Sequence, residues 1–229
     1  MDFYAEAFRA ALLLLRDFNP DVRDALFRSL RIATIATFFA ALSGIPVGGL
    51  IALNSFRGKR IVISTFSTLM AVPTVVVGLL LYGLYTRRGL LGHLDLLYSE
   101  TAIISAEFVL TFPVIVRLTI AALGSVDPRV GQTALTLGAN RVQALALYLR
   151  EALTGIAAAT IVGYGRAISE VGAAMIVGGN IRGQTRTLTT AIALESSRGE
   201  FALGLALGGL LLGVFLIINV ALLRVQDSS

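Results

Sequence analysis

Two residues of opposite charge, Arg166 and Glu170, lie four positions apart in a segment that is otherwise apolar from Ala152 to Ile181. Side chains at positions i and i+4 of a helix can meet, which lowers the cost of keeping both charges in apolar surroundings. Because ionisable residues at membrane depth are functional candidates, the pair is interpreted as a candidate gate. The alternative is a neutralised pair that only fixes helix packing.

A second candidate site is the polar, glycine-containing segment from Gly178 to Thr190. Its hydrogen-bond donors and charges are carried by Asn180, Arg182, Thr185, Arg186, Thr187, Thr189 and Thr190. An oxyanion has several acceptor oxygens, so a path that conducts it needs donors of this kind. An external loop that only contacts a partner protein explains the same composition, and the two interpretations stay open.

Other kinds of site find little support. The chain has no cysteine and one histidine, His93, so no disulfide and no Cys/His metal site is expected within one chain. Its only lysine, Lys59, is followed by Arg60, and the phosphate-binding Gly-x-x-x-x-Gly-Lys-Ser/Thr motif is absent, so a partner must bind any ATP. A membrane enzyme that uses Glu170 or His93 is the alternative from another class, but neither residue lies in a recognisable catalytic cluster. No catalytic residue is predicted.

The elements that position these residues are apolar enough to cross a membrane. Hydrophobic residues make up 56% of the chain and charged residues 14%, with a mean hydropathy of +0.82, whereas soluble domains carry about a quarter charged residues. Crossing the bilayer core as a helix takes about 20 apolar residues. The predicted spans are about 32–53, 61–85, 101–126, 152–181 and 201–223. Residues 20–229 are therefore predicted to form a single all-α transmembrane domain, and the arginines scattered between the spans argue against nucleic-acid binding.

The spans contain internal features of their own. Pro46, Pro73 and Pro113 predict kinks in the first three. Glu107 and Arg117 are weaker functional candidates, because they lie near opposite ends of the third span, where long side chains can reach the interface. Glycines with small-xxx-small spacing indicate close helix contacts, within one chain or between two copies: Gly44 and Gly48 in the first span and Gly204, Gly208, Gly209 and Gly213 in the last.

Charge alone leaves the topology open. Residues 1–19 mix charged residues with one apolar helical face, which predicts an amphipathic helix in the membrane interface and excludes a signal peptide. The link 54–60 carries Arg57, Lys59 and Arg60, which favours a cytoplasmic position and an N-terminus outside. Five arginines within residues 1–31 argue against an outside N-terminus.

The segment 127–151 is too charged for lipid and is predicted to form two short helices. Asp127 can cap the first helix, Gly138 can end it, and a second can run from Asn140 to Arg150. Their apolar side is suited to docking and is formed by Val130, Ala134, Leu137, Val142, Leu145 and Leu149.

The run from Gln132 to Ala139 in this segment resembles the EAA motif of ABC importer permeases, a cytoplasmic coupling helix that contacts the ATPase. Gln132 and Thr133 stand where the motif usually has Glu and Ala. The resemblance implies a coupling role for Gln132, Thr133, Ala134, Gly138 and Ala139. It also implies that 127–151 is cytoplasmic, which with five spans places the N-terminus outside and the C-terminus in the cytoplasm.

The runs 165–173, 177–183 and 185–195 resemble the tungstate branch of the molybdate, sulfate and tungstate permeases, through Gly-Gly-Asn-Ile-Arg-Gly and Thr-Thr-Ala-Ile-Ala-Leu-Glu. This resemblance implies the type I ABC importer permease fold in the cell (inner) membrane. It also implies a homodimer of this chain, two ATP-binding-cassette subunits that hold ATP and Mg, and an external oxyanion-binding protein. Tungstate is the implied substrate, and molybdate, sulfate or phosphate are the alternatives.

Overall fold

The computed structural model of the chain describes residues 9, 13 and 20–227, so the interfacial helix predicted for 1–19 lies almost entirely outside the described residues. Within the described part, all regular structure is helical, as expected. The elements are α2 (Pro20–Leu53), α3 (Lys59–Leu69), α4 (Thr74–Tyr85), the 3-10 turn η1 (Gly92–Leu94), α5 (Glu100–Gly124), α6 (Pro128–Thr136), α7 (Arg141–Glu151), α8 (Leu153–Ile168), α9 (Gly172–Gly178), α10 (Leu188–Ser197) and α11 (Phe201–Asp227).

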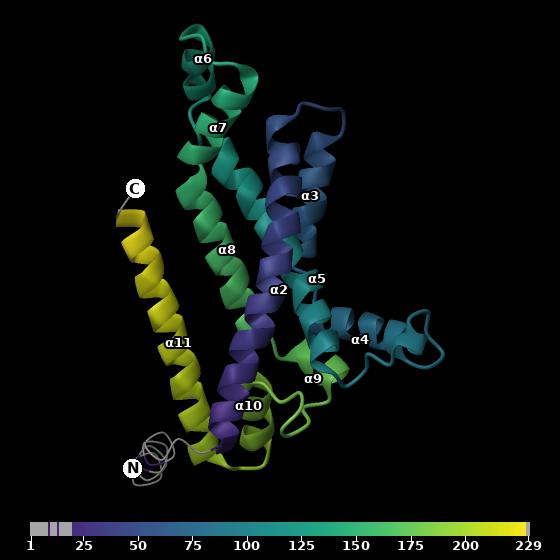
Figure 1. Cartoon of the computed structure of the whole chain (residues 1–229). Coiled ribbons are helices and arrows are strands. Elements are labelled where there is room, and N and C mark those ends of the chain that lie inside the picture. Colours follow the sequence, from purple (N-terminus) through teal and green to yellow (C-terminus); the bar gives the residue numbers. More distant parts are fainter. Residues whose placement is uncertain (1–8, 10–12, 14–19, 228–229) are drawn as a thin grey trace.

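The helices α2, α5 and α8 pack lengthwise, and α11 lies along the outside of this bundle (Figure 1). Glycine makes the α2–α5 contact close: a Cβ on Gly48 would lie 2.8 Å from both the carbonyl oxygen of Val116 and the Cβ of Thr119. Gly44 faces Ile115 in the same way, so the glycines of the first span serve a contact within the chain. Those at 208, 209 and 213 meet nothing within 4 Å in this chain.

The predicted span 61–85 is broken at Pro73, where a kink was expected. It is divided into α3 and α4, whose axes meet at 92°. Pro73 directly precedes α4 and has no N–H to donate, so it cannot continue the hydrogen bonding of α3. The helix α4 leaves the bundle sideways (Figure 1). At its last residue, the hydroxyl of Tyr85 donates a hydrogen bond to Ser105 Oγ of α5 at 2.7 Å.

The predicted span 152–181 is wrong as a single helix that carries both Arg166 and Glu170, because α8 ends at Ile168 and a separate short helix, α9, follows from Gly172. Among the described residues, α2 and α5 are the continuous helices long and apolar enough to cross a membrane; the α3/α4 and α7/α8 pairs would each count as one bent span. The helix α2 begins at Pro20, whereas the predicted span began near Ile32. The charged residues that precede Ile32 in the sequence therefore belong to the first turns of the same helix.

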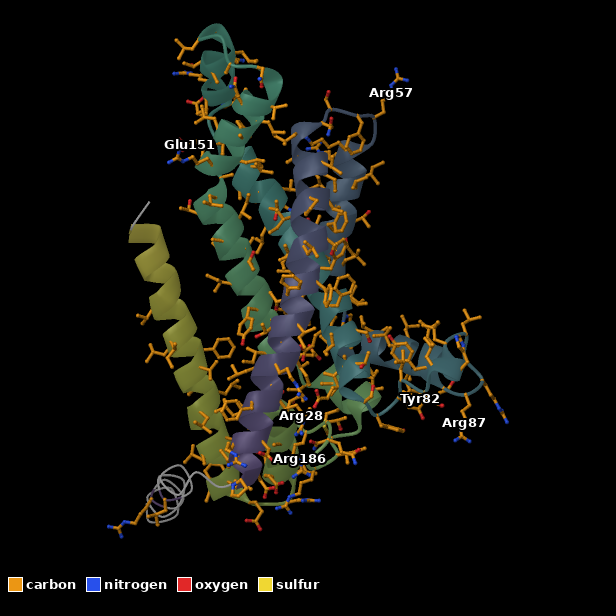
Figure 2. All side chains as sticks on the ribbon, in the orientation of Figure 1. Arg28, Arg57, Tyr82, Arg87, Glu151 and Arg186 are labelled. Carbon is orange, nitrogen blue, oxygen red and sulfur yellow. The ribbon has the colours of Figure 1, made fainter. Side chains whose placement is uncertain are left out.

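The molecule has two opposite ends. Arg57 and Glu151 lie at one end with α6 and α7, whereas Arg28 and Arg186 lie at the other (Figure 2). We call these the coupling end and the far end. The helix α2 begins at the far end and α11 ends toward the coupling end (Figure 1). The basic link 54–60 and the segment 127–151 therefore lie at the same end, as the sequence predicted.

Candidate functional site

The coupling element, α6 with α7, is shaped by a glycine at its bend. The helix α6 ends in a Schellman motif: the N–H of Gly138 donates to the carbonyl of Leu135 at 3.1 Å, and the N–H of Ala139 donates to that of Ala134 at 3.0 Å. This motif requires a left-handed residue after the helix, and Gly138 has φ of +89°. The expected break at Gly138 is confirmed.

Side chains cap both helices of the coupling element. Asp127 Oδ1 accepts the N–H of Arg129 at 2.8 Å, as expected for the cap of α6. At α7, the side chain of Asn140 accepts the N–H of Gln143, and the Gln143 side chain accepts the N–H of Asn140, both at 2.9 Å. This reciprocal capping box satisfies two donors that the first turn would otherwise leave open. The geometry of the bend is thus encoded locally.

The coupling element exposes a large apolar surface. The exposed fraction is 83% for Leu137 and 74% for Val142. Gln132 and Thr133 are also exposed, whereas Ala134 is buried. Exposed apolar clusters rimmed by polar residues mark interaction surfaces, so the element is suited to contact another protein.

Arg166 and Glu170 form the predicted pair. Nη1 of Arg166 donates to Oε2 of Glu170 at 2.9 Å, with side chains 29% and 2% exposed. The pair does not lie within a continuous helix, because Glu170 follows the end of α8. Its Oε1 accepts the N–H of Ala173 at 2.9 Å and so satisfies the first turn of α9. One carboxylate therefore joins the end of α8 to the start of α9.

Glu107 of α5 lies within electrostatic reach of Glu170. Its side chain is enclosed by protein, with an exposed fraction of 3%, and its Oε2 has no hydrogen-bond partner among the described residues. The interpretation that Glu107 reaches the interface is therefore wrong. The helices α8 and α9 both pack against α5, and spacing within α5 alone could not reveal the burial of Glu107 that results from tertiary packing.

The threonines of the segment 178–190 bond within the fold. Thr185 Oγ1 donates to the carbonyl of Gly178 at 2.6 Å, and Thr189 Oγ1 donates to that of Glu170 at 2.7 Å. Thr187 caps α10. These hydroxyl groups order the turn between α9 and α10, so in this conformation they are not free to donate to an oxyanion.

Asn180 is held in the left-handed region, with φ of +50°. Its Nδ2 donates to the carbonyl of Thr190 at 3.1 Å, and its buried Oδ1 has no partner among the described residues. The side-chain atom left over is an acceptor, which does not suit an anion. A path role for Asn180 remains a prediction.

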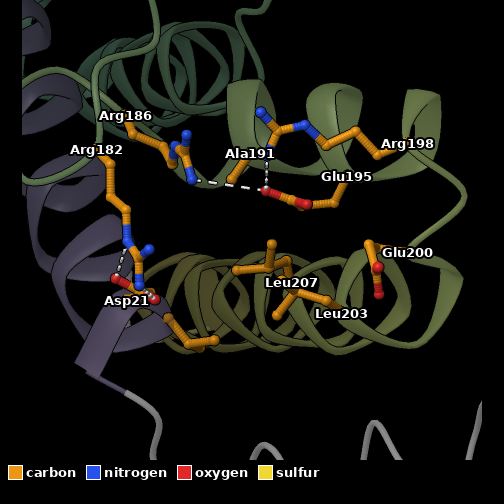
Figure 3. A pocket seen from close by; sticks show the side chains of 10 residues that line it. Asp21, Arg182, Arg186, Ala191, Glu195, Arg198, Glu200, Leu203 and Leu207 are labelled. Atoms are coloured by element: carbon orange, nitrogen blue, oxygen red, sulfur yellow. Dashed lines mark hydrogen bonds and ion pairs between the residues drawn. The ribbon is translucent and has the colours of Figure 1, made fainter.

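Arg186 lies at the far end in a pocket of about 540 Å³ (Figure 3). Its guanidinium is 3.5 Å from Glu195, which Arg198 also approaches to 3.7 Å. Next to Arg186, Arg182 pairs with Asp21 at the start of α2 (Figure 3). The pocket thus contains paired charges of both signs from α2, the turn before α10, and α10 with Arg198 directly after it, whereas α11 contributes Leu203 and Leu207.

A second ion-pair group at the far end was not found from the sequence. Nε of Arg28 donates to Oε1 of Glu100 at 2.9 Å, and its Nη2 donates to the carbonyl of Gly183 at 2.8 Å. Arg31 pairs with the other oxygen of Glu100. Glu100 is 72 residues from Arg28 and 69 residues from Arg31, so no pattern of neighbouring residues in the sequence indicates these ion pairs. Five arginines within residues 1–31 argued against an N-terminus outside the cell. Two of them, Arg28 and Arg31, are paired with Glu100 in the folded chain.

Comparison with known proteins decides the family. Residues 44–228 match the model of the binding-protein-dependent transport system inner membrane component family. The chain belongs to this family. One relative that can be aligned over almost the full chain is the tungstate uptake system permease protein TupB of Peptoclostridium acidaminophilum. It is 40% identical over 227 residues, which cover 99% of this chain and all of that protein.

Two further comparisons place this permease more broadly. The molybdenum transport system permease protein ModB of Escherichia coli is 32% identical over 177 residues, covering 74% of this chain and 77% of ModB. A chain of the inward-facing MetNI methionine ABC transporter superposes with a TM-score of 0.73 at 18% identity, covering 91% of this chain and 95% of that one. The predicted ABC importer permease fold is confirmed.

Proposed function

We propose that this permease is the membrane subunit of an ATP-driven importer for tungstate. The observation that carries the proposal is the 40% identity to a tungstate uptake permease over nearly the whole chain. Molybdate is the second candidate, favoured by the 32% identity to a molybdenum permease over a shorter region.

The proposed complex contains a second copy of this chain, two ATPase subunits and an external oxyanion-binding protein. The exposed apolar surface of the coupling element supports an ATPase partner at the coupling end, with Gln132, Thr133 and Gly138 on its accessible side. ATP and Mg would be held by that partner. This arrangement puts the coupling end and the C-terminus in the cytoplasm and the far end outside.

The Arg166–Glu170 pair is proposed to act during gating. It joins α8 to α9, so a change in the relative position of these helices must strain or break a buried ion pair. The far-end pocket, with its paired charges, is proposed to lie on the face that meets the binding protein.

The direct test purifies the permease with its ATPase and adds the binding protein loaded with tungstate, molybdate, sulfate or phosphate. Tungstate-loaded protein should stimulate ATP hydrolysis at the lowest concentration. If none of the four loaded forms raises the rate above that of the unloaded protein, an importer of these oxyanions is the wrong assignment. If molybdate acts best, the second candidate replaces the first.

A further inference from the structure

The helix α3 carries hydroxyl groups on the side that faces away from the rest of the chain. None of its residues is buried. One side packs against α2 and α5 through Val62, Ile63 and Phe66. The opposite side lines a groove of about 310 Å³, formed by Ile61, Ser64, Thr65, Thr68 and Leu69. The hydroxyls of Thr65 and Thr68 donate to the carbonyls of Ile61 and Ser64 within α3, both at 3.0 Å. The hydroxyl of Ser64 has no partner among the described residues, which indicates contact with water or a polar partner at this point of the groove.

Arg117 of α5 lies beside this face. Its Nε donates to Ser67 Oγ at 3.0 Å, and no carboxylate among the described residues pairs with it. Its terminal nitrogens likewise have no acceptor within the described part of the chain. By contrast, Arg28 and Arg166 are each paired with a glutamate.

The depth of Arg117 makes its lack of a counter-ion significant. It precedes the end of α5 at Gly124 by about 10 Å, at about 1.5 Å per helical residue. Ser67 lies about 12 Å beyond the start of α3 at Lys59 on the same rise. The guanidinium thus bonds to a residue at its own depth instead of extending to the interface. An unpaired cation there is costly unless water or an anion accompanies it.

We propose that Arg117, Ser64 and Ser67 form an oxyanion subsite on the coupling-end half of the transport path. The proposal rests on the proposed function. Ser64 lies three residues before Ser67, so both fall on one side of α3. The hydroxyl of Ser67 donates to the carbonyl of Ile63 at 3.0 Å, whereas that of Ser64 donates to no described residue.

The chemistry fits a tetrahedral dianion. A guanidinium presents several N–H donors in one plane, and charge-assisted hydrogen bonds to oxyanions are about twice as strong as neutral ones. Only Nε of Arg117 is engaged among the described residues, so the remaining donors and the Ser64 hydroxyl are available to the anion. A site with one cation and few hydroxyls would hold the anion without trapping it.

The first test measures tungstate uptake by the reconstituted transporter for Arg117→Gln and Arg117→Lys, with Arg57→Gln as the matched control in the exposed link before α3. Loss of a charged hydrogen-bond donor should lower uptake about tenfold or more in Arg117→Gln. Arg117→Lys should retain most of it, and the control should match wild type. Stimulation of ATP hydrolysis by loaded binding protein should persist in all variants. Unchanged uptake in Arg117→Gln, or a parallel loss of ATPase stimulation, would overturn the subsite.

The second test does not require transport. The chain has no cysteine, so Thr68→Cys introduces one thiol into the groove, and Phe38→Cys supplies an exposed apolar control on α2. A small water-soluble thiol reagent should modify Thr68→Cys quickly and Phe38→Cys slowly, and tungstate should slow the reaction of Thr68→Cys unless Arg117 is also changed to Gln. Equal, slow reaction at both positions would place the groove against lipid or a second copy and refute the proposal. If the unmodified transporter itself takes up no tungstate, the proposed function is rejected, whatever the variants do.

Discussion

Gly138 offers the most sharply defined perturbation of coupling. Its φ of +89° lies in the left-handed region, and a Cβ there would meet nothing within 4 Å. A substitution therefore causes backbone strain without a steric clash. Left-handed backbone costs an ordinary L-residue about 1–2 kcal/mol, and more for a β-branched one, which lowers the fraction of correctly bent coupling element about 5- to 30-fold.

The assay is ATP hydrolysis by the purified complex, stimulated by loaded binding protein, for Gly138→Asn, Gly138→Ala and Gly138→Val. Stimulation should fall in that order, because asparagine tolerates the left-handed region best. Gly124→Val is the matched control, since Gly124 also faces open space but lies at the end of α5 without a positive φ. Thermal stability should hardly change. Wild-type stimulation in Gly138→Val would show that coupling does not depend on the left-handed bend at Gly138.

Three further predictions concern the pair, the packing and the topology. Arg166→Gln or Glu170→Gln should each destabilise the permease by about 3 kcal/mol, since the first strands the buried Glu170 and the second the partly buried Arg166, and the double variant should recover stability in thermal unfolding. Gly48→Ala should lower thermal stability by about 1–3 kcal/mol, because its methyl group would overlap the backbone of α5. In intact cells, a membrane-impermeant thiol reagent should label His93→Cys but not Thr136→Cys.

Each of these predictions has its own contradictory outcome. Additive losses in the double variant would show that Arg166 and Glu170 do not act as a pair. Gly209→Ala is the control for packing because that glycine has open space around it. If Gly48→Ala and Gly209→Ala lose the same thermal stability, the close contact of α2 with α5 at Gly48 is not the cause. Labelling of both Thr136→Cys and Ser55→Cys would show that the coupling end lies outside, opposite to the proposed topology.

Sequence reasoning worked where structure is determined by a few adjacent residues. The coupling element is such a case: Asp127 and Gly138 act on nearby residues, so the cap of α6, the bend and the start of a second helix near Asn140 could be predicted. The Arg166–Glu170 contact follows equally from i, i+4 spacing.

Sequence reasoning failed where distant segments meet. Hydropathy could not distinguish a continuous span from the α3/α4 bend, although Pro73 marked its position. The bond from Thr189 to Glu170 and the pairing of Asp21 with Arg182, which is 161 residues away, depend on tertiary packing. Donor-rich composition in 178–190 therefore suggested an anion path where the hydroxyl groups in fact bond to the fold.

ATP-driven tungstate import is tested directly by tungstate accumulation in proteoliposomes that contain the permease and its ATPase, with ATP enclosed on the ATPase side and the binding protein added opposite. Tungstate should accumulate above its external concentration, and this accumulation should require both ATP and the binding protein. Sulfate and phosphate should not accumulate to the same extent. Tungstate entry that proceeds without ATP, or no entry although the complete complex hydrolyses ATP on addition of loaded binding protein, would contradict it.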